Sequence, residues 1–202
     1  MNYPEYVIID GEEYKINTDF RIALKCDEIA RDEEIGDYER PLAIIYLLFG
    51  DKGLDNKRHY GKLFEYAQKY LACGNEEFLK KRKRNEKNDL DLVKCEGLIK
   101  SSFKFDYQYD PYKNKYLHWY EFYNDLMNLS TSEFGTCCIL NRVVDILNQD
   151  LSQIKDSKER NSLKETQDEY RKKYCIKTKK KITKEQQSMM DKICEVFNLR
   201  KE

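Results

Sequence analysis

Few positions in this chain can form tight turns, because only eight glycines and three prolines are spread over its 202 residues. An all-β protein would need more turns than this between its strands. Hydrophobic residues nevertheless make up 40% of the chain, which is too large an apolar fraction for a disordered polypeptide. We therefore expect a mainly α protein, with a core large enough to fold without disulfides or a metal.

The clearest strand signal lies near the N-terminus. Residues 6–16 place β-branched and aromatic residues on both sides of Asp10-Gly11. This dipeptide favours a two-residue hairpin turn between antiparallel strands. A short β-hairpin should therefore open the fold.

Helical periodicity dominates the chain after the hairpin. Asn17 or Thr18 is a suitable N-cap for a first helix, and Asp19 would then lie in the first turn, where the helix dipole favours an acid. Pro41 suits the first turn of a second helix, and residues 42–49 are apolar all round, as in a helix buried on most sides. The apolar face expected for the first helix consists of Ile22, Cys26, Ile29 and Ala30. Further helices are expected at about residues 60–71, 89–103, 116–129 and 137–151.

Residues 115–123 concentrate aromatic side chains. They contain the only tryptophan, one of the two histidines and four other aromatic residues. On a helix, positions 116, 119, 120, 123, 126 and 127 would share one broad face. Because large rings most often pack in a core, we expect this segment to be a hub of the fold.

The last quarter of the chain is more highly charged, and its apolar stripes are thinner. Residues 183–186, Thr-Lys-Glu-Gln, match a capping box that would open a final helix. We expect a helical body at residues 1–150 and a charged helical extension at 151–202, in which two helices form an arm. The apolar residues that this arm would offer to a partner are Leu163, Tyr170, Tyr174, Met190 and Phe197.

Charge is unevenly distributed, although the formal net charge is zero. Basic clusters at residues 80–84 and 171–184 have tyrosine and phenylalanine nearby, a combination that could hold nucleic acid. However, the isoelectric point is about 6.8, and no RNA- or DNA-binding motif is present. Solvated loops explain the clusters better, and a nucleic-acid-binding module remains the alternative.

Catalytic and ligand-binding motifs are not apparent. His59 and His118 are the only histidines, and neither lies in a setting typical of a nucleophile and its base. The glycines form no phosphate-binding loop, and the seven cysteines include no CxxC pair that would suggest zinc. We therefore expect no enzyme activity, no metal and no cofactor.

The cysteines and the apolar runs indicate the cellular compartment of the protein. An odd number of cysteines without paired spacing is typical of reduced thiols in a cytosolic protein. The longest apolar run, residues 41–49, is far too short to span a bilayer. We expect a cytoplasmic protein with no membrane partner.

Two segments together resemble the bacteriophage gene-product-fifteen family. The first is residues 14–21, which contain Asn17, Thr18, Asp19, Phe20 and Arg21. The second is residues 116–122, which contain Leu117, His118, Trp119 and Phe122. The similarity covers most of residues 5–150 and becomes looser after 151. Tyr120 stands where the family usually has a second tryptophan, a change that keeps an aromatic ring.

The resemblance implies a function in phage tail morphogenesis without catalysis. Members occur in the tail modules of long-tailed phages and prophages of Gram-positive bacteria. The implied function is that of an assembly chaperone for the tape measure protein in the host bacterial cytoplasm. Contacts with another tail assembly protein, self-association, or a structural place in the finished tail are alternatives. The motif residues are expected to specify the fold, and the arm is expected to bind the partner.

Overall fold

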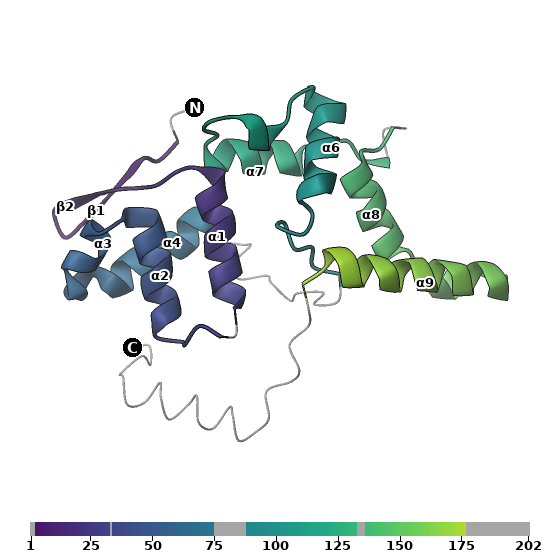
Figure 1. The fold of residues 1–202 in the computed structure, drawn as a ribbon, viewed down its shortest axis with the longest axis horizontal. Helices are drawn as coiled ribbons and strands as arrows, with labels where there is room; N and C mark the ends of the chain where they lie inside the picture. Colours follow the sequence, from purple (N-terminus) through teal and green to yellow (C-terminus); the bar gives the residue numbers. More distant parts are fainter. Residues whose placement is uncertain (1–2, 33, 75–87, 133–135, 177–202) are drawn as a thin grey trace, which may run out of the picture.

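The computed structural model describes residues 3–32, 34–74, 88–132 and 136–176 (Figure 1). Within these ranges, eight α-helices and one two-stranded antiparallel sheet confirm the expected mainly α fold with an N-terminal hairpin. The strands are β1 (Tyr6–Ile9) and β2 (Glu12–Lys15). The helices are α1 (Phe20–Arg31), α2 (Glu39–Phe49), α3 (Lys52–Asp55), α4 (Tyr60–Leu71), α6 (Glu96–Tyr107), α7 (Trp119–Met127), α8 (Ile139–Asn148) and α9 (Ser157–Tyr174). Short 3-10 helices lie at Lys57–His59, Pro111–Lys113 and Leu151–Gln153.

The hairpin has the turn that its sequence predicts. Asp10 and Gly11 connect the strands with φ angles of +51° and +86°, the left-handed values that a type I′ turn requires. On the inner face of the hairpin, Tyr14 is buried and its hydroxyl lies 2.7 Å from Nδ1 of His59. This contact ties the hairpin to the segment that precedes α4.

Helix α1 differs from the prediction in its cap and in its buried face. Its N-cap is Asp19 rather than Asn17 or Thr18, and Phe20 is the first helical residue. The buried side chains of α1 are Phe20, Ala23, Leu24 and Cys26. Ala30 is exposed, because the register set by Phe20 turns that position outward. Helix α4 begins and ends where the sequence predicts.

Helix α2 is not buried on most sides, as its sequence had suggested. It contacts α1, α3 and α4 (Figure 1). Its buried side chains are Ile44, Ile45, Leu48 and Phe49. The neighbouring helices cover this one face, so the Tyr46 side chain remains 48% exposed and Leu47 is half-buried. Helix α2 therefore has apolar surface that the described parts of the chain leave uncovered.

The helices in the second half of the body begin at later residues than predicted. Helix α6 begins at Glu96, so residues 89–95 are not its first turns. Helix α7 begins at Trp119, and Tyr116 therefore precedes the helix instead of sharing its face. Helix α8 begins at Ile139, with Cys138 as its N-cap. Within this half, Phe103 of α6 and Phe122 of α7 are fully buried and stack with their ring centroids 5.5 Å apart.

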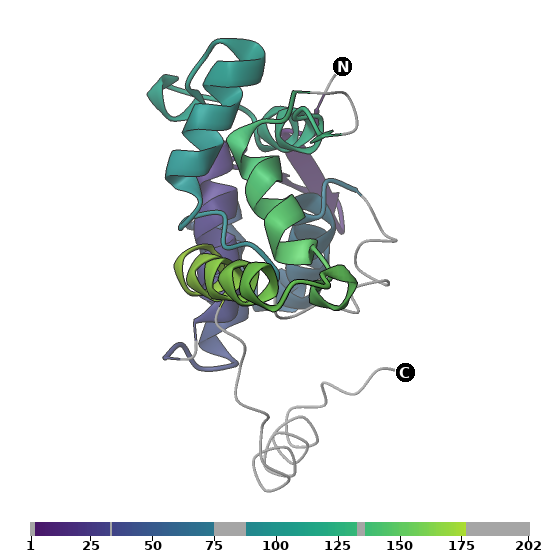
Figure 2. The same cartoon turned by 90° about the vertical axis from the view of Figure 1, so that its right-hand side faces the viewer.

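Helix α9 packs against α8 and extends beyond it (Figures 1 and 2). The amide of Gln167 donates to the carbonyl oxygens of Ile146 and Gln149, at 2.9 Å each. A small second core lies at this contact, separate from the main one. Its buried members are Val143, Leu147 and Cys175, and Leu90, Leu98, Tyr170 and Tyr174 pack against them. The described part of the predicted arm is thus attached to the body.

Several predicted features lie outside the described residues. They are the basic cluster at 80–84, residues 177–184 of the second basic run, the capping box at 183–186, Met190 and Phe197. Among the helices that the structure does describe, none combines the length and the apolar character needed to cross a membrane.

Candidate functional site: two joined helix starts and an adjacent groove

The two sequence segments singled out above meet in space. Asp19 and His118 form an isolated antiparallel β-bridge although 99 positions separate them. The backbone N–H of Phe20 donates to the carbonyl oxygen of Leu117 at 3.0 Å, and that of Trp119 donates to the carbonyl oxygen of Thr18 at 2.7 Å. The first residues of α1 and α7 are therefore held side by side.

The two bridged residues also cap the helices that follow them. Oδ1 of Asp19 accepts from the backbone N–H of Arg21 at 2.9 Å, and Nδ1 of His118 accepts from that of Tyr120 at 3.0 Å. A ring nitrogen that accepts a hydrogen bond must be unprotonated, so His118 serves as a cap only when it is neutral. Burial lowers the pKa of His118 below its ordinary value and favours this neutral form.

Polar side chains of the same segments fix the loop before α7. Nη1 of Arg21 contacts both carboxylate oxygens of Asp19, at 2.9 and 3.1 Å. Its Nη2 donates to the carbonyl oxygens of Tyr112 and Asn114 at 3.1 and 2.5 Å. The hydroxyl groups of Thr18 and Tyr116 lie 2.6 Å apart. These contacts hold residues 112–116 against the start of α1.

Aromatic rings form the core below this junction. Phe20 stacks on Phe122 with a centroid distance of 4.3 Å, and Trp119 stacks on Phe122 at 6.0 Å. Trp119 is 5% exposed, and its Nε1 donates to the carbonyl oxygen of Leu71 at 3.2 Å. The ring therefore connects α7 to the end of α4. These contacts assign the rings to the core of the fold.

Asn17 is the exception among the motif residues. Its backbone N–H donates to the carbonyl oxygen of Leu48 at 2.7 Å, so its position is fixed. Its side chain is exposed and makes no hydrogen bond to any part of the chain that the structure describes.

An open groove of about 780 Å³ lies beside the junction. One wall is the extended segment 15–18 together with Tyr116, and the other is the end of α2. The described residues that line it are Glu5, Lys15, Ile16, Asn17, Thr18, Ile22, Tyr46, Leu47, Leu48, Phe49, Gly50 and Tyr116. Sequence reasoning missed this groove, although the uniformly apolar residues 42–49 carried a signal for it. A helix with apolar residues on all sides needs more cover than the described helices supply to α2.

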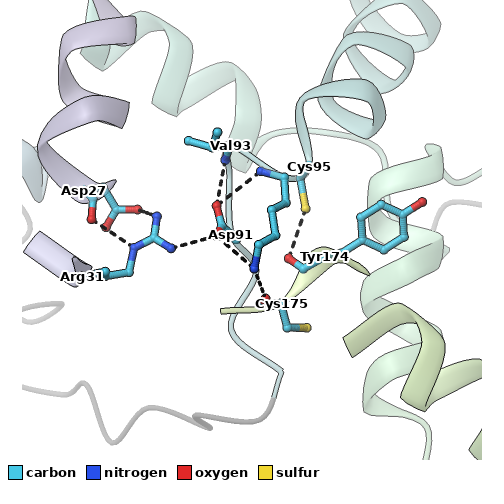
Figure 3. A network of polar contacts seen from close by, with 8 residues as sticks. Asp27, Arg31, Asp91, Val93, Cys95, Tyr174 and Cys175 are labelled. Carbon is cyan, nitrogen blue, oxygen red and sulfur yellow. Dashed lines mark hydrogen bonds and ion pairs between the residues drawn. The ribbon is translucent and has the colours of Figure 1, made fainter. Parts of the chain in front are cut away.

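A second site that the sequence did not suggest anchors the end of α9 (Figure 3). Oδ2 of Asp91 lies 3.1 Å from Nη1 of Arg31, and its Oδ1 accepts from the backbone N–H of Val93 at 3.1 Å. Nζ of Lys94 lies 3.4 Å from the same carboxylate and donates to the carbonyl oxygen of Cys175 at 2.9 Å. Burial opposes ionisation of Asp91, but Arg31 and Lys94 outweigh it and hold its pKa below the ordinary value.

Backbone bonds complete the anchor. The N–H of Asp91 donates to the carbonyl oxygen of Tyr174 at 2.8 Å, and that of Ile176 donates to Asp89 at 2.9 Å. The chain at 89–91 therefore runs antiparallel to 174–176, which explains why α6 starts late. These contacts join α1, the segment before α6 and the end of α9.

Reactive groups are not assembled at either place. Burial raises the pKa of the Cys26, Cys73 and Cys95 thiols to about 12, so each stays protonated at neutral pH. In the described ranges, no three His, Cys, Asp or Glu side chains gather in a way that could hold a metal ion.

The sequence profile described as "Bacteriophage Gp15 protein" matches residues 3–172. The chain belongs to this family. Membership places it among phage structural and morphogenesis proteins. No curated protein and no solved structure matches the chain.

The extent of the family match bears on the layout of the chain. The match includes both motif segments, the groove and almost all of α9. It therefore reaches further than the looser similarity expected after residue 151. In this Gp15 chain α9 belongs to the family's region, together with its contact on α8.

The predicted partner-binding residues of the Gp15 chain are placed in different surroundings. Leu163 is half-buried on α9. Tyr170 and Tyr174 are also half-buried and pack against the second core. Met190 and Phe197 lie outside the described residues. Binding of a partner by Tyr170 or Tyr174 would therefore require α9 to move from α8, and it stays a prediction.

Proposed function

We propose that this phage morphogenesis protein is a tail assembly chaperone that binds the tape measure protein in the host cytoplasm and catalyses no reaction. A tape measure protein has long apolar helical stripes, which aggregate unless another apolar surface covers them. The observation that carries the proposal is the uncovered apolar surface of a chain with 37% charged residues. Tyr46 and Tyr116 leave about half of each side chain exposed beside one groove.

The arrangement of the motif residues supports a binding function. Asp19 and His118 cap helices, Arg21 holds a loop, and Phe20 and Trp119 pack in the core. All of these side chains are engaged in holding the fold. A protein whose signature specifies a rigid surface is suited to present that surface to another protein.

A co-expression experiment tests this function. The tape measure protein would be produced alone, with the full chain, and with a chain that lacks residues 157–202. We expect the full chain to keep the tape measure protein in the soluble fraction and to co-purify with it. If the tape measure protein aggregates equally with and without the full chain, the chaperone function is rejected.

The truncated chain tests the arm separately. Removing residues 157–202 uncovers Val143 and Leu147, so its folding must first be checked by circular dichroism and thermal unfolding. A chain that lacks only residues 177–202 keeps α9 and its contact with α8 but loses Met190 and Phe197, so it separates the contribution of α9 from that of these two residues. If the arm binds the partner, the longer deletion loses activity while the body stays folded. A folded body that remains fully active assigns binding to the rest of the molecule.

A further inference from the structure

The groove beside the junction exposes apolar side chains that none of the described residues covers. Tyr46 is 48% exposed and Tyr116 is 55% exposed, while Ile22 and Leu47 of the same lining are half-buried. The hydroxyl of Tyr116 is fixed by Thr18 at 2.6 Å, so the ring is held in place before any ligand arrives. Tyrosine rings held in this way give a large contact area at a small entropic cost.

The Asn17 side chain adds a polar group that lacks an internal partner. Its backbone is held by Leu48, Asn17 is one of the groove's lining residues, and its exposed amide makes no hydrogen bond to the described residues. A carboxamide can donate and accept at the same time, and so can a peptide group. The amide is therefore matched to one peptide unit of a second polypeptide.

The charges of the groove favour an uncharged ligand. Among the described lining residues, only Glu5 and Lys15 are charged, and they have opposite signs. Nucleic acid is held mainly by an excess of positive charge, which this groove does not have. A strongly acidic or basic peptide would likewise meet no net charge of the opposite sign.

The geometry points to an extended, uncharged, apolar segment of another protein chain as the ligand of this groove. A regular helix uses its peptide groups internally, whereas an extended segment leaves them free for Asn17. Apolar side chains of the segment cover the Tyr46 and Tyr116 rings, and the amide of Asn17 pairs with its backbone. The inference rests on the proposed function only in that the ligand is a protein.

Binding can be measured with a synthetic probe. The probe is the capped peptide acetyl-Gly-Leu-Ser-Phe-Ser-Leu-Gly-amide, titrated into the full chain labelled with ¹⁵N. We expect saturable shifts of the Asn17 side-chain amide signals. Tyr46→Ala should weaken binding about tenfold and Asn17→Ala about threefold, because the first removes an apolar contact and the second one neutral hydrogen bond.

Two controls distinguish binding in the groove from nonspecific hydrophobic binding. Phe105→Ala removes a side chain that is 58% exposed on α6, outside the groove, and should leave the affinity unchanged. A probe methylated on alternate peptide nitrogens keeps its side chains but should bind more weakly, because its backbone can no longer pair. All variants should keep the melting temperature of the parent chain, since the altered side chains are exposed.

The inference is overturned if the probe produces no saturable shift, or if Phe105→Ala weakens binding as much as Tyr46→Ala. It is also overturned if the methylated probe, or one with lysine or glutamate in place of leucine, binds as tightly as the parent probe. The tape measure protein is absent from this experiment. A failed co-expression test would therefore leave the result of the titration intact.

Discussion

At the scale of single residues, His118 has a function that only one protonation state permits. Its Nδ1 accepts the hydrogen bond from the N–H of Tyr120, and Asp19 opposite caps α1 in the same way. The imidazolium form has no acceptor nitrogen and would lose this cap. The junction of α1 and α7 therefore depends on a neutral histidine.

This dependence predicts a stability that falls in acid. The folded pKa of His118 lies below the value of 6.5 for an unperturbed histidine, so the unfolded chain takes up a proton first as the pH falls. The contribution of His118 should be complete above about pH 7.5 and should decrease through pH 6.5 towards the folded pKa. His118→Asn keeps an oxygen acceptor at the N-cap and cannot titrate.

Urea unfolding of both proteins between about pH 7.5 and pH 5.5 tests the prediction. The free energy of unfolding of the parent chain should fall more steeply with decreasing pH than that of the variant. His59 is present in both proteins and cancels in the comparison. Parallel curves over the whole range would show that His118 does not titrate differently on folding.

Trp119 should be the most costly single ring to remove from the junction. It is buried, stacks on Phe122 and donates a hydrogen bond to Leu71. Trp119→Ala should lower the free energy of unfolding by about 3 to 5 kcal/mol, because it leaves a cavity that the helices cannot close. Trp119→Phe keeps a ring at this position and should lower the free energy of unfolding by less than Trp119→Ala does. An unchanged melting temperature for the alanine variant would contradict the core role of Trp119.

At the scale of secondary-structure elements, Gly53 allows α3 to lie close to α2. A β-carbon at this position would lie 2.8 Å from Cβ of Phe49 and 2.9 Å from Cγ2 of Ile45. Gly53→Ala should therefore destabilise the fold by about 1 to 3 kcal/mol through overpacking. Thermal or urea unfolding measures the change.

Gly61 provides the matched control for this substitution. It lies in α4, and a β-carbon there would come within 4 Å of no described atom outside the local backbone of its own helix. Gly61→Ala should leave stability unchanged or raise it by up to about 1 kcal/mol, because alanine is the better helix former. Equal effects of the two substitutions would contradict the close packing of α3 on α2.

The anchor of α9 predicts that one carboxylate governs the docking of a whole helix. Asp91→Asn keeps an oxygen for the N–H of Val93 but leaves Arg31 and Lys94 without their shared charge partner. It should destabilise the fold by about 2 kcal/mol, below the roughly 3 to 5 kcal/mol of a fully broken buried pair, because Arg31 keeps its ion pair with Asp27. Hydrogen exchange of the Ile176 amide, which donates to Asp89, should accelerate because α9 is held less firmly.

Asp168→Asn tests whether the loss of a different carboxylate charge, one on α9 itself, would also accelerate exchange of the Ile176 amide. Asp168 pairs with Arg171 at 2.9 Å on the exposed side of the helix. Removing this ion pair should lower the free energy of unfolding by less than about 1 kcal/mol, as for other exposed ion pairs. If Ile176 exchange accelerates equally in both variants, the Asp91 cluster is not the anchor.

The elements also show which structural features were predictable from local sequence. The hairpin and α4 follow local rules, a turn dipeptide and a helical repeat, and both are as predicted. The starts of α1, α6 and α7 depend on pairing between distant segments, 18–20 with 117–119 and 89–91 with 174–176. Asn17, Thr18 and Asp19 are all residue types that can cap a helix, and this pairing selects Asp19 instead of the two residues that the sequence favoured.

The same reasoning applies to the candidate site. The importance of Asn17–Arg21 and Leu117–Phe122 was predicted, but not that the two segments touch. The groove was missed because exposure of Tyr46 depends on which side of α2 its neighbours cover. The anchor was missed because Asp91 and Arg31 lie 60 positions apart and belong to no local pattern.

At the scale of the whole molecule, the fold combines a well-packed body with surface that it does not cover. The main core extends from the hairpin to the start of α8, and α9 closes a smaller core at the other side. The groove lies beside the junction that the family motif builds. We interpret this organisation as a scaffold for protein binding during tail assembly.

The most direct test of this interpretation is where the protein is found during phage production. Quantitative mass spectrometry would measure its amount relative to the tail tube protein in purified mature particles, and its amount in complexes isolated with the tape measure protein from infected cells. A chaperone should be abundant in the complexes and absent from the particles. A fixed number of copies in every mature particle would contradict the account and make the chain a structural component of the tail.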